Sequence, residues 1–443
     1  MKQSIGQKFT PVTLLKFAFP SMVMMVFMSC YTIIDGIFIS RFLGDHALSS
    51  VNIVFPIINI LLAIGIMLAT GGSAVVAQKL GAGKHETARN DFTMLVISGL
   101  IASFLLLALT HLFLTPICRL LGATDLLVPH CTAYLGTVIL FAPACMLQTL
   151  FQAFFVTAGK PQIGLVLTII AGISNAVLDY VFLGPLGLGI EGAALATGIG
   201  QMIPAVFGVI FFFFVKGDLY FTRFTFHVGT LLAASANGSS EMVTNLSNAV
   251  ITYFFNFIMM RLAGESGVAA ITIVLYAEFL FNALYLGFSM GVAPVFSFHY
   301  GASNERELQN VYRISVWFVL LSALAITGMS YLASDSIVGI FAGGSTDTYA
   351  LATQGFSLFS LAFLCSGFNI FSSALFTALS DGKTSALISF TRTFGFILLS
   401  LLILPALFGI HGVWLAIPTA EFLTVFLAAF YHVRKRHVYH YLK

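Results

Sequence analysis

Charge is scarce in this sequence of 443 residues. Only 8% of the residues are Asp, Glu, Lys or Arg, whereas about a quarter of the residues in a typical soluble domain are charged. Hydrophobic residues make up 59% of the chain, which is more apolar surface than a soluble core of this length could hide. The formal net charge of +3 is also small and gives no indication of nucleic-acid binding. The composition therefore excludes an ordinary soluble domain and favours a membrane protein.

The residue patterns of a metalloprotein or an enzyme are missing as well. No His-x-x-x-His pair lies within an apolar run, and the five cysteines lack metal-ligand spacing: Cys30, Cys118, Cys131, Cys145 and Cys365. The glycines before Lys84 do not form a phosphate-binding loop, because Gln78 replaces the leading glycine and His85 follows the lysine. No nucleophile is paired with a base. We expect no metal, no bound cofactor and no enzymatic activity.

Apolar runs of membrane-spanning length are abundant. They recur from near Leu14 to near Val433, each about 20 residues long, with only short polar breaks between them. They predict twelve transmembrane helices that start near residues 14, 50, 92, 131, 163, 190, 231, 268, 311, 351, 385 and 411. The predicted fold is an all-α polytopic membrane protein.

The basic residues are distributed unevenly between the two sides of these spans. With a cytoplasmic N-terminus, the odd-numbered loops hold only Arg41, Arg119 and Arg261. The even-numbered loops and both tails hold the other seventeen: Lys2, Lys8, Lys16, Lys79, Lys84, Arg89, Lys160, Lys216, Arg223, Arg306, Arg313, Lys383, Arg392, Arg434, Lys435, Arg436 and Lys443. By the positive-inside rule, this asymmetry predicts a multi-pass protein of the plasma (inner) membrane with both termini in the cytoplasm.

The sequence repeats itself with an offset of 220 residues. The matching pairs are 41–45 with 261–265, Asn90 with Asn310, and 185–196 with 405–416. Two parallel repeats of six helices imply two pseudo-symmetric bundles related by an axis along the membrane normal, with a cleft between them that suits alternating access. We expect an N-terminal lobe of residues 1–215, a cytoplasmic linker of residues 216–230 and a C-terminal lobe of residues 231–443.

Five acids lie well inside the predicted spans, and no Lys or Arg is assigned a comparable depth. The acids are Asp35, Asp179, Glu241, Glu278 and Glu421. An ionised carboxylate at the bilayer centre costs roughly 2.5 to 3.5 kcal/mol, so a missing counter-charge has to be mobile. A proton, a sodium ion or a cationic substrate could supply it. For any one acid, a neutral carboxyl that hydrogen-bonds across helices is the structural alternative.

The depths of these acids divide them into two groups. Asn175 and Asp179 lie one helical turn apart, and the rise per residue brings Asp35, Tyr134 and Thr197 to the same outer half of the membrane. In the second half of the chain, the side chains nearer mid-depth are Glu241, Glu278, Asn282 and Glu421. We interpret the second group as residues of a substrate cavity.

Three stretches resemble the multidrug and toxin extrusion (MATE) family, in the branch of DinF-type and MepA-type exporters. They are Ile34-Asp-Gly-Ile-Phe-Ile-Ser-Arg-Phe-Leu-Gly44, Ser174-Asn-Ala-Val-Leu-Asp179 and Gly189-Ile-Glu-Gly-Ala-Ala-Leu-Ala-Thr197. The resemblance extends from about Lys16 to Val433. It implies a cation-coupling site in the N-terminal lobe, made of Asp35, Tyr134, Asn175, Asp179 and Thr197. It does not extend to the NorM-type branch, whose coupling site includes an acid on helix ten, because the tenth span here offers only Asn369.

These observations predict a secondary active multidrug exporter. It would release lipophilic cationic drugs or dyes by antiport against inward H⁺ or Na⁺, as a monomer in contact with membrane lipid, and would contribute to antibiotic resistance. The alternative within the same superfamily is a flippase for a lipid-linked oligosaccharide. That function needs basic groups in the cleft to hold a pyrophosphate, and Arg392 is the only candidate.

Overall fold

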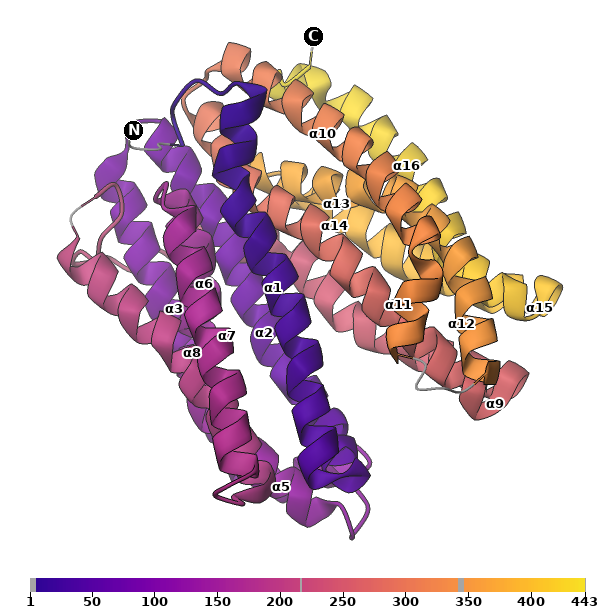
Figure 1. Cartoon of the computed structure of the whole chain (residues 1–443). Helices are drawn as coiled ribbons and strands as arrows, with labels where there is room; N and C mark the ends of the chain where they lie inside the picture. The colour runs from indigo at the N-terminus through magenta and orange to yellow at the C-terminus, as the bar shows by residue number, and fades with distance from the viewer. Residues whose placement is uncertain (1–4, 216, 342–345, 443) are drawn as a thin grey trace.

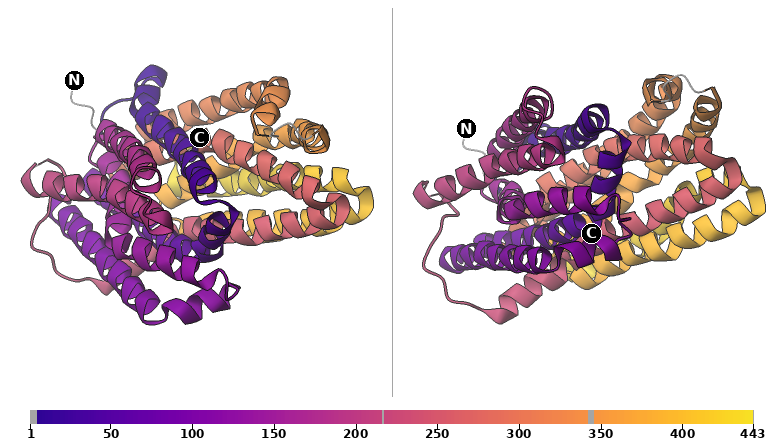
Figure 2. Two further views of the ribbon diagram at one scale, coloured as in Figure 1. Left: turned by 60° about the horizontal axis from the view of Figure 1, so that its bottom comes forward. Right: turned by 90° about the horizontal axis from the view of Figure 1, so that it is seen from below.

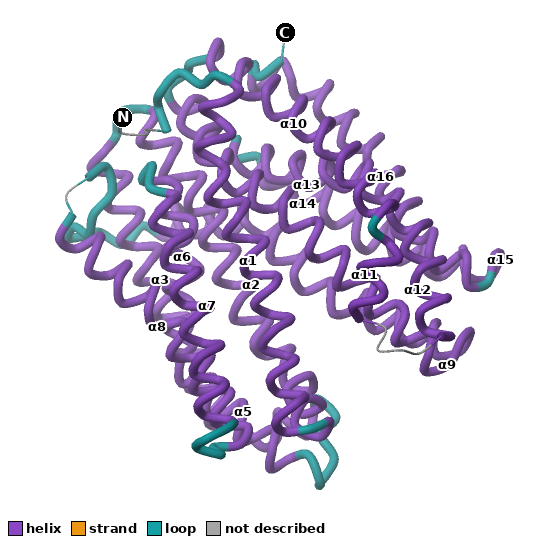
Figure 3. Tube along the Cα trace, in the orientation of Figure 1, coloured by secondary structure: helices purple, strands orange, loops and turns teal. Residues whose placement is uncertain are grey.

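The computed structural model describes residues 5–215, 217–341 and 346–442, and this part of the chain is helical with no strand (Figure 3). The first half contains α1 (Pro11–Leu43), α2 (Asp45–Gly81), α3 (His85–Leu112), α4 (Leu114–Leu120), α5 (Val128–Val138), η1 (Ile139–Phe141), α6 (Ala142–Thr157), α7 (Pro161–Leu183) and α8 (Gly189–Phe214). The second half contains α9 (Val228–Gly301), α10 (Glu305–Leu332), α11 (Ser334–Phe341), α12 (Thr346–Phe359), η2 (Ser360–Ala362), α13 (Phe363–Ala378), α14 (Gly382–Phe390), η3 (Thr391–Ile397), α15 (Leu398–Phe408) and α16 (Ile410–Tyr439). The predicted all-α fold is confirmed.

Eleven helical segments of the described chain are long and apolar enough to cross a membrane. One of them, α9, has 74 residues and would be about 110 Å long if straight, several times the hydrocarbon thickness of a bilayer. Gly264 interrupts it with a positive φ of 62°, so α9 supplies two crossings and the total is the twelve that were predicted. The helices begin one to seven residues before the predicted starts, because their polar first turns precede the apolar stretch.

The internal repeat is visible in the backbone. Residues with positive φ recur at offsets of 220 or 221: Gly44 with Gly264, Gly83 with Ser303, Gly159 with Ser380, and Gly189 with Gly409. The short helices α4 and α11, which the sequence analysis treated as loops, occupy equivalent places in the two halves. Both halves therefore have the same helical plan. The lobe limits at 215 and 231 stay a prediction, and Lys2, Lys216 and Lys443 lie outside the described residues.

The two halves form two bundles that meet at the end of the molecule where both chain termini lie (Figure 1). From that end, the indigo-to-magenta bundle (α1 to α8) and the salmon-to-yellow bundle (α9 to α16) diverge towards the end marked by α5 and the turn of α9. The views in Figure 2 show the same separation of the two bundles. We call the closed end the terminus end and the other the far end.

Glycines bring the backbones of the two bundles into contact at the terminus end. A Cβ atom added to Gly71 of α2 would overlap the carbonyl oxygen of Ala234 in α9, and one added to Gly238 would overlap the carbonyl oxygen of Met67. Gly81 and Gly301, at the ends of α2 and α9, have the same relation to Phe298 and Gln78. Such contacts allow the close helix packing that replaces the hydrophobic effect in a lipid environment.

Each bundle also holds the segment of chain that leads into the other bundle. The side chain of Asn310 in α10 donates to the carbonyl oxygen of Phe9 (2.7 Å), and Glu307 accepts from the Phe9 amide (2.7 Å). In the pseudo-symmetric place on α3, the side chain of Asn90 accepts from the amide of Thr225 (2.7 Å) and donates to its carbonyl oxygen (3.2 Å). These two residues are the Asn90 and Asn310 of the sequence repeat.

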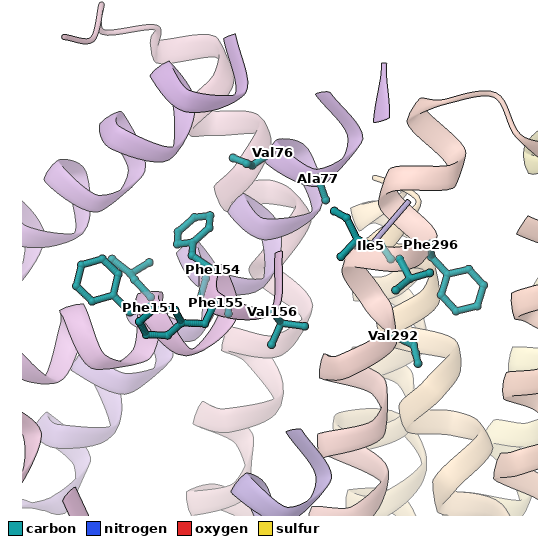
Figure 4. Close-up of a cluster of buried hydrophobic side chains, with 14 of the residues drawn as sticks. Ile5, Val76, Ala77, Phe151, Phe154, Phe155, Val156, Val292 and Phe296 are labelled. Carbon is teal, nitrogen blue, oxygen red and sulfur yellow. The ribbon is translucent and has the colours of Figure 1, made fainter. Parts of the chain in front are cut away.

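A buried hydrophobic cluster at the terminus end continues from one bundle into the other (Figure 4). Ile5, Ala77 and Phe296 come from the N-terminal segment, α2 and α9, and Phe151 and Phe154 of α6 belong to the same cluster. Closure of the terminus end thus combines backbone contact, side-chain hydrogen bonds and apolar packing.

We expect Gly71→Ala to weaken this closure, because the new methyl group overlaps the Ala234 carbonyl oxygen and α2 must move away from α9. Overpacking of this kind lowers the free energy of unfolding by about 1 to 3 kcal/mol. Thermal unfolding in detergent measures the change. The matched control is Gly328→Ala on an exposed face of α10, where an added Cβ atom meets nothing within 4 Å. Equal unfolding temperatures for the two variants would contradict the proposed role of Gly71.

Candidate functional site

The first candidate site lies in the first bundle, in the half nearer the far end. Two glycines bring its helices together: a Cβ atom added to Gly172 of α7 would lie 2.5 Å from the Phe27 ring of α1, and one added to Gly200 of α8 would lie 3.2 Å from the Cβ of Asn175. Because α7 packs this closely against both neighbours, polar side chains from α1, α7 and α8 meet inside the bundle.

Asp35 of α1 and Asp179 of α7 face each other, with their carboxyl groups within hydrogen-bonding range. Asp179 is fully buried, and neither of its carboxyl oxygens receives a hydrogen bond from any other described group. Oδ1 of Asp35 also lacks such a hydrogen bond. Neither carboxylate can donate to the other while both are ionised. The pair can therefore coexist only if it shares a proton or holds a cation between its oxygens.

The other predicted members of this site surround the two acids. The side-chain amide of Asn175 donates to the hydroxyl of Thr197 (3.5 Å), and Tyr134 of α5 is buried within electrostatic range of both carboxyls. The structure thus brings together the five residues that the sequence analysis grouped. Their role in coupling stays a prediction.

Tyr31 is a further member that the sequence analysis did not identify. It lies on α1 one turn before Asp35, against Thr197 and within electrostatic range of both acids. The i, i+4 spacing of Tyr31 and Asp35 is the signal that could have shown it, since residues so spaced share a helix face.

The second candidate site lies at mid-depth in the second bundle, and it corrects one expectation. The sequence predicts Arg392 in a cytoplasmic loop and no Lys or Arg as deep as the acids. Arg392 instead lies in the π-helical turn η3, ten residues or about 15 Å beyond the start of α14. Its guanidinium donates through Nε to Oε1 of Glu421 on α16 (2.8 Å), and its side chain is only 15% exposed.

The three acids of this bundle do not share the same partners. Asn369 of α13 donates to Oε2 of Glu421 (2.7 Å), so both oxygens of that buried carboxylate are satisfied. Asn282 donates to Oε1 of Glu278 one turn away (3.3 Å) and accepts from the hydroxyl of Ser366 (3.0 Å). Glu421 and Glu278 are thus fixed by hydrogen bonds, but only Glu421 has a direct basic partner among the described residues.

Glu241 completes the cluster from the first part of α9. Its carboxylate accepts a long hydrogen bond from the hydroxyl of Ser373 (3.5 Å). Glu241 and Glu278 both lie within electrostatic range of Arg392. The cluster therefore contains three acids and one base, and two carboxylates remain available to attract a cation.

The described residues contain no group of three or more His, Cys, Asp or Glu side chains that could hold a metal ion. The Asp35 and Asp179 pair, with the side-chain oxygens of Asn175 and Thr197, offers the oxygen ligands that suit a hard cation such as sodium. The same carboxyls could carry a proton instead. The arrangement therefore allows the buried charge to be neutralised by a bound cation or by a proton.

Comparison with known proteins identifies the family. The MatE family model matches residues 20–181 and 242–402, one segment in each half of the chain. The chain is 23% identical to the multidrug export protein MepA of Staphylococcus haemolyticus, over 96% of this chain and 94% of that protein. It is 22% identical to MepA of Staphylococcus saprophyticus, over 90% of this chain and 87% of that protein.

Solved structures confirm the fold. An outward-facing conformation of a multidrug resistance MATE family transporter of the MOP superfamily has a TM-score of 0.91 and 21% identity, with 97% of both chains covered. A MOP superfamily transporter from Pyrococcus furiosus has a TM-score of 0.90 and 20% identity over the same shares. The family match covers well over half of the chain and confirms the predicted resemblance, and the expectation of a transporter rather than an enzyme is confirmed with it. The chain belongs to the MatE family of multidrug and toxin extrusion transporters.

Proposed function

We propose that this protein exports lipophilic cationic compounds by antiport against a cation, H⁺ or Na⁺, through alternating access. The observation that carries the proposal is the pair of facing carboxyls, Asp35 and Asp179, which has no basic partner among the described residues. The relatives support the export of drugs, since both MepA proteins are named multidrug export proteins.

The coupling step follows from the cost of an uncompensated carboxylate in the membrane. With the termini in the cytoplasm, the far end faces outwards and the two bundles diverge towards the outside. A cation arriving from outside neutralises the Asp35 and Asp179 pair and removes the repulsion between them. The neutral pair favours a different packing of α1 against α7, and the change weakens the binding of the substrate at the second bundle.

We assign the substrate to the second bundle, near Glu241 and Glu278. Arg392 neutralises Glu421, so these two acids remain to attract a lipophilic cation, with Asn282 as a hydrogen-bonding group beside them. The flippase alternative receives no support from Arg392, because its guanidinium is bound to Glu421 and two further acids lie near it. An anionic pyrophosphate would meet an excess of negative charge there.

Orientation and location are part of the same proposal. The basic residues Lys84, Arg306 and Lys435 belong to helix ends or turns at the terminus end, whereas Arg119 belongs to α4 at the far end. Without Arg392, the sequence assigns sixteen basic residues to the even-numbered loops and tails and three to the odd-numbered loops, so the asymmetry remains. We propose a plasma (inner) membrane protein with both termini in the cytoplasm, which acts as a monomer in contact with lipid.

We expect a cysteine at Thr124 to react with a membrane-impermeant maleimide in intact cells and a cysteine at Lys84 to react only after permeabilisation. Both positions are exposed, so a difference between them reports the side of the membrane. The unsubstituted chain gives the background from its own thiols. Labelling of Lys84→Cys in intact cells would show that the proposed orientation is wrong.

Asp179→Asn and Asp35→Asn should abolish gradient-driven export and leave folding intact. The amide keeps the size and hydrogen-bonding capacity of the side chain but cannot be charged, so neutralisation can no longer drive the cycle. Efflux of a fluorescent cation from vesicles is measured under an imposed proton gradient and, separately, under an imposed sodium gradient. Asp125→Asn, in an exposed loop at the far end, is the matched control. Wild-type efflux from well-expressed Asp179→Asn and Asp35→Asn proteins would show that the acids are neutral structural groups.

Glu278→Gln and Glu241→Gln should each weaken equilibrium binding of a cationic dye in detergent by about tenfold, as expected for the loss of one charged contact in a shielded site. Fluorescence polarisation gives the dissociation constants without any gradient. Glu305→Gln, at the start of α10 on the terminus end, should leave binding unchanged. If an anionic dye bound wild-type protein better than the cationic one, the proposed substrate class would be wrong.

A further inference from the structure

A pocket of about 410 Å³ lies on the terminus end of the second bundle, between the first turns of α14 and the last turns of α16. Lys383, Arg434 and Lys435 supply three positive charges to its wall, and its other lining residues are Thr384, Leu387, Tyr431 and Val438. It is separate from both candidate sites inside the bundles, because its residues belong to helix ends rather than to mid-depth positions.

One of the three positive charges is balanced within the protein. Lys435 Nζ lies 2.9 Å from Oδ2 of Asp381, a carboxylate that also accepts from the amide (3.2 Å) and the hydroxyl (2.7 Å) of Thr384. Burial raises the pKa of Asp381, but the hydrogen bonds from Lys435 and Thr384 outweigh burial and hold it below its ordinary value. Asp381 therefore stays ionised. Lys383 and Arg434, both exposed, are left without an acidic partner among the described ion pairs.

Asp381 also limits how an anion can bind at the start of α14. Its side chain caps the helix by accepting from the amide of Thr384, so the free amide groups that often bind anions at a helix start are partly occupied. An anion in this pocket must be held by the side chains of Lys383 and Arg434.

Exposed apolar side chains continue from the pocket towards the middle of the membrane. On α14, Leu387 and Phe390 are 44% and 54% exposed, within about 10 Å of Lys383 along the helix. On α16, Phe430 is 52% exposed, and the guanidinium of Arg434 lies 5.7 Å from the centre of its ring. A charged opening above exposed apolar walls matches a phospholipid, whose phosphate lies at the interface and whose acyl chains extend into the hydrocarbon.

We infer that the pocket between α14 and α16 binds an anionic phospholipid, with Lys383 and Arg434 holding the headgroup phosphate and with Leu387, Phe390 and Phe430 contacting an acyl chain. Charge complementarity selects an anionic over a zwitterionic headgroup, since two positive charges remain unbalanced. Which leaflet supplies the lipid depends on the proposed orientation of the protein. The binding itself does not depend on the proposed transport activity. Loss of lipid binding and loss of export can therefore be observed separately.

The test compares binding of phosphatidylglycerol and phosphatidylcholine to the purified full chain by native mass spectrometry. Wild-type protein should retain one phosphatidylglycerol in preference to phosphatidylcholine. The double variant Lys383→Gln/Arg434→Gln should bind phosphatidylglycerol roughly thirtyfold more weakly, as expected when two interfacial charges are removed, while keeping its far-ultraviolet circular dichroism. Arg306→Gln/Arg313→Gln, which removes two exposed charges from α10 on the same side of the molecule, should bind like wild type.

Three results would overturn the inference. Equal retention of phosphatidylcholine would show that charge does not select the lipid. An equal loss of phosphatidylglycerol in the α10 double variant would show that general charge, rather than this pocket, attracts it. Competition by inorganic phosphate at concentrations equal to those of the lipid would show a site for free anions.

Discussion

The contact on which the rest of the structure depends is the approach of α2 to α9 at the terminus end. The two backbones touch at the terminus end because the residues at the contact have no side chains: Gly71, Gly81, Gly238 and Gly301. This fixes one end of the molecule as closed and leaves the other free to diverge (Figure 1). Any change of access has to open this contact, and the side-chain hydrogen bonds of Asn90 and Asn310 have to change with it.

The same helical plan carries different chemistry in the two bundles. At the repeat offset of 220, Asp35 corresponds to Phe255 and Asp179 to Leu399, so the acid pair has no counterpart in the second bundle. Arg392 in turn corresponds to Gly172, whose missing side chain lets Phe27 pack against α7. The repeat therefore specifies the packing of both bundles. A few residue differences between the repeats give the first bundle an unpartnered acid pair and the second a partly neutralised acidic cluster.

Much of the fold could be predicted because hydropathy, charge asymmetry and the repeat are long-range patterns that can be read from the sequence. Depth and helical spacing were also sufficient to group Asp35 with Asn175 and Asp179, since both follow from a fixed rise per residue. Arg392 could not be placed in the same way. Its depth depends on where α14 begins, and its partner, Glu421, lies on another helix 29 residues later. The repeat of Asn90 and Asn310 was visible in the sequence, but the segments they hold were not, because those hydrogen bonds join different bundles.

In the proposed mechanism, the two charged sites together favour exchange over leak. A buried carboxylate without a counter-charge costs several kcal/mol, so conformations in which both the acid pair and the acidic cluster are empty are poorly populated during a change of access. Arg392 lowers that cost for Glu421, and in the proposed mechanism a cationic ligand lowers it for Glu241 and Glu278. In the proposed mechanism, a change of access therefore needs a cation in at least one of the two sites. We propose that this requirement, in a scaffold closed at one end by glycines, links the inward movement of a small cation to the release of a large one.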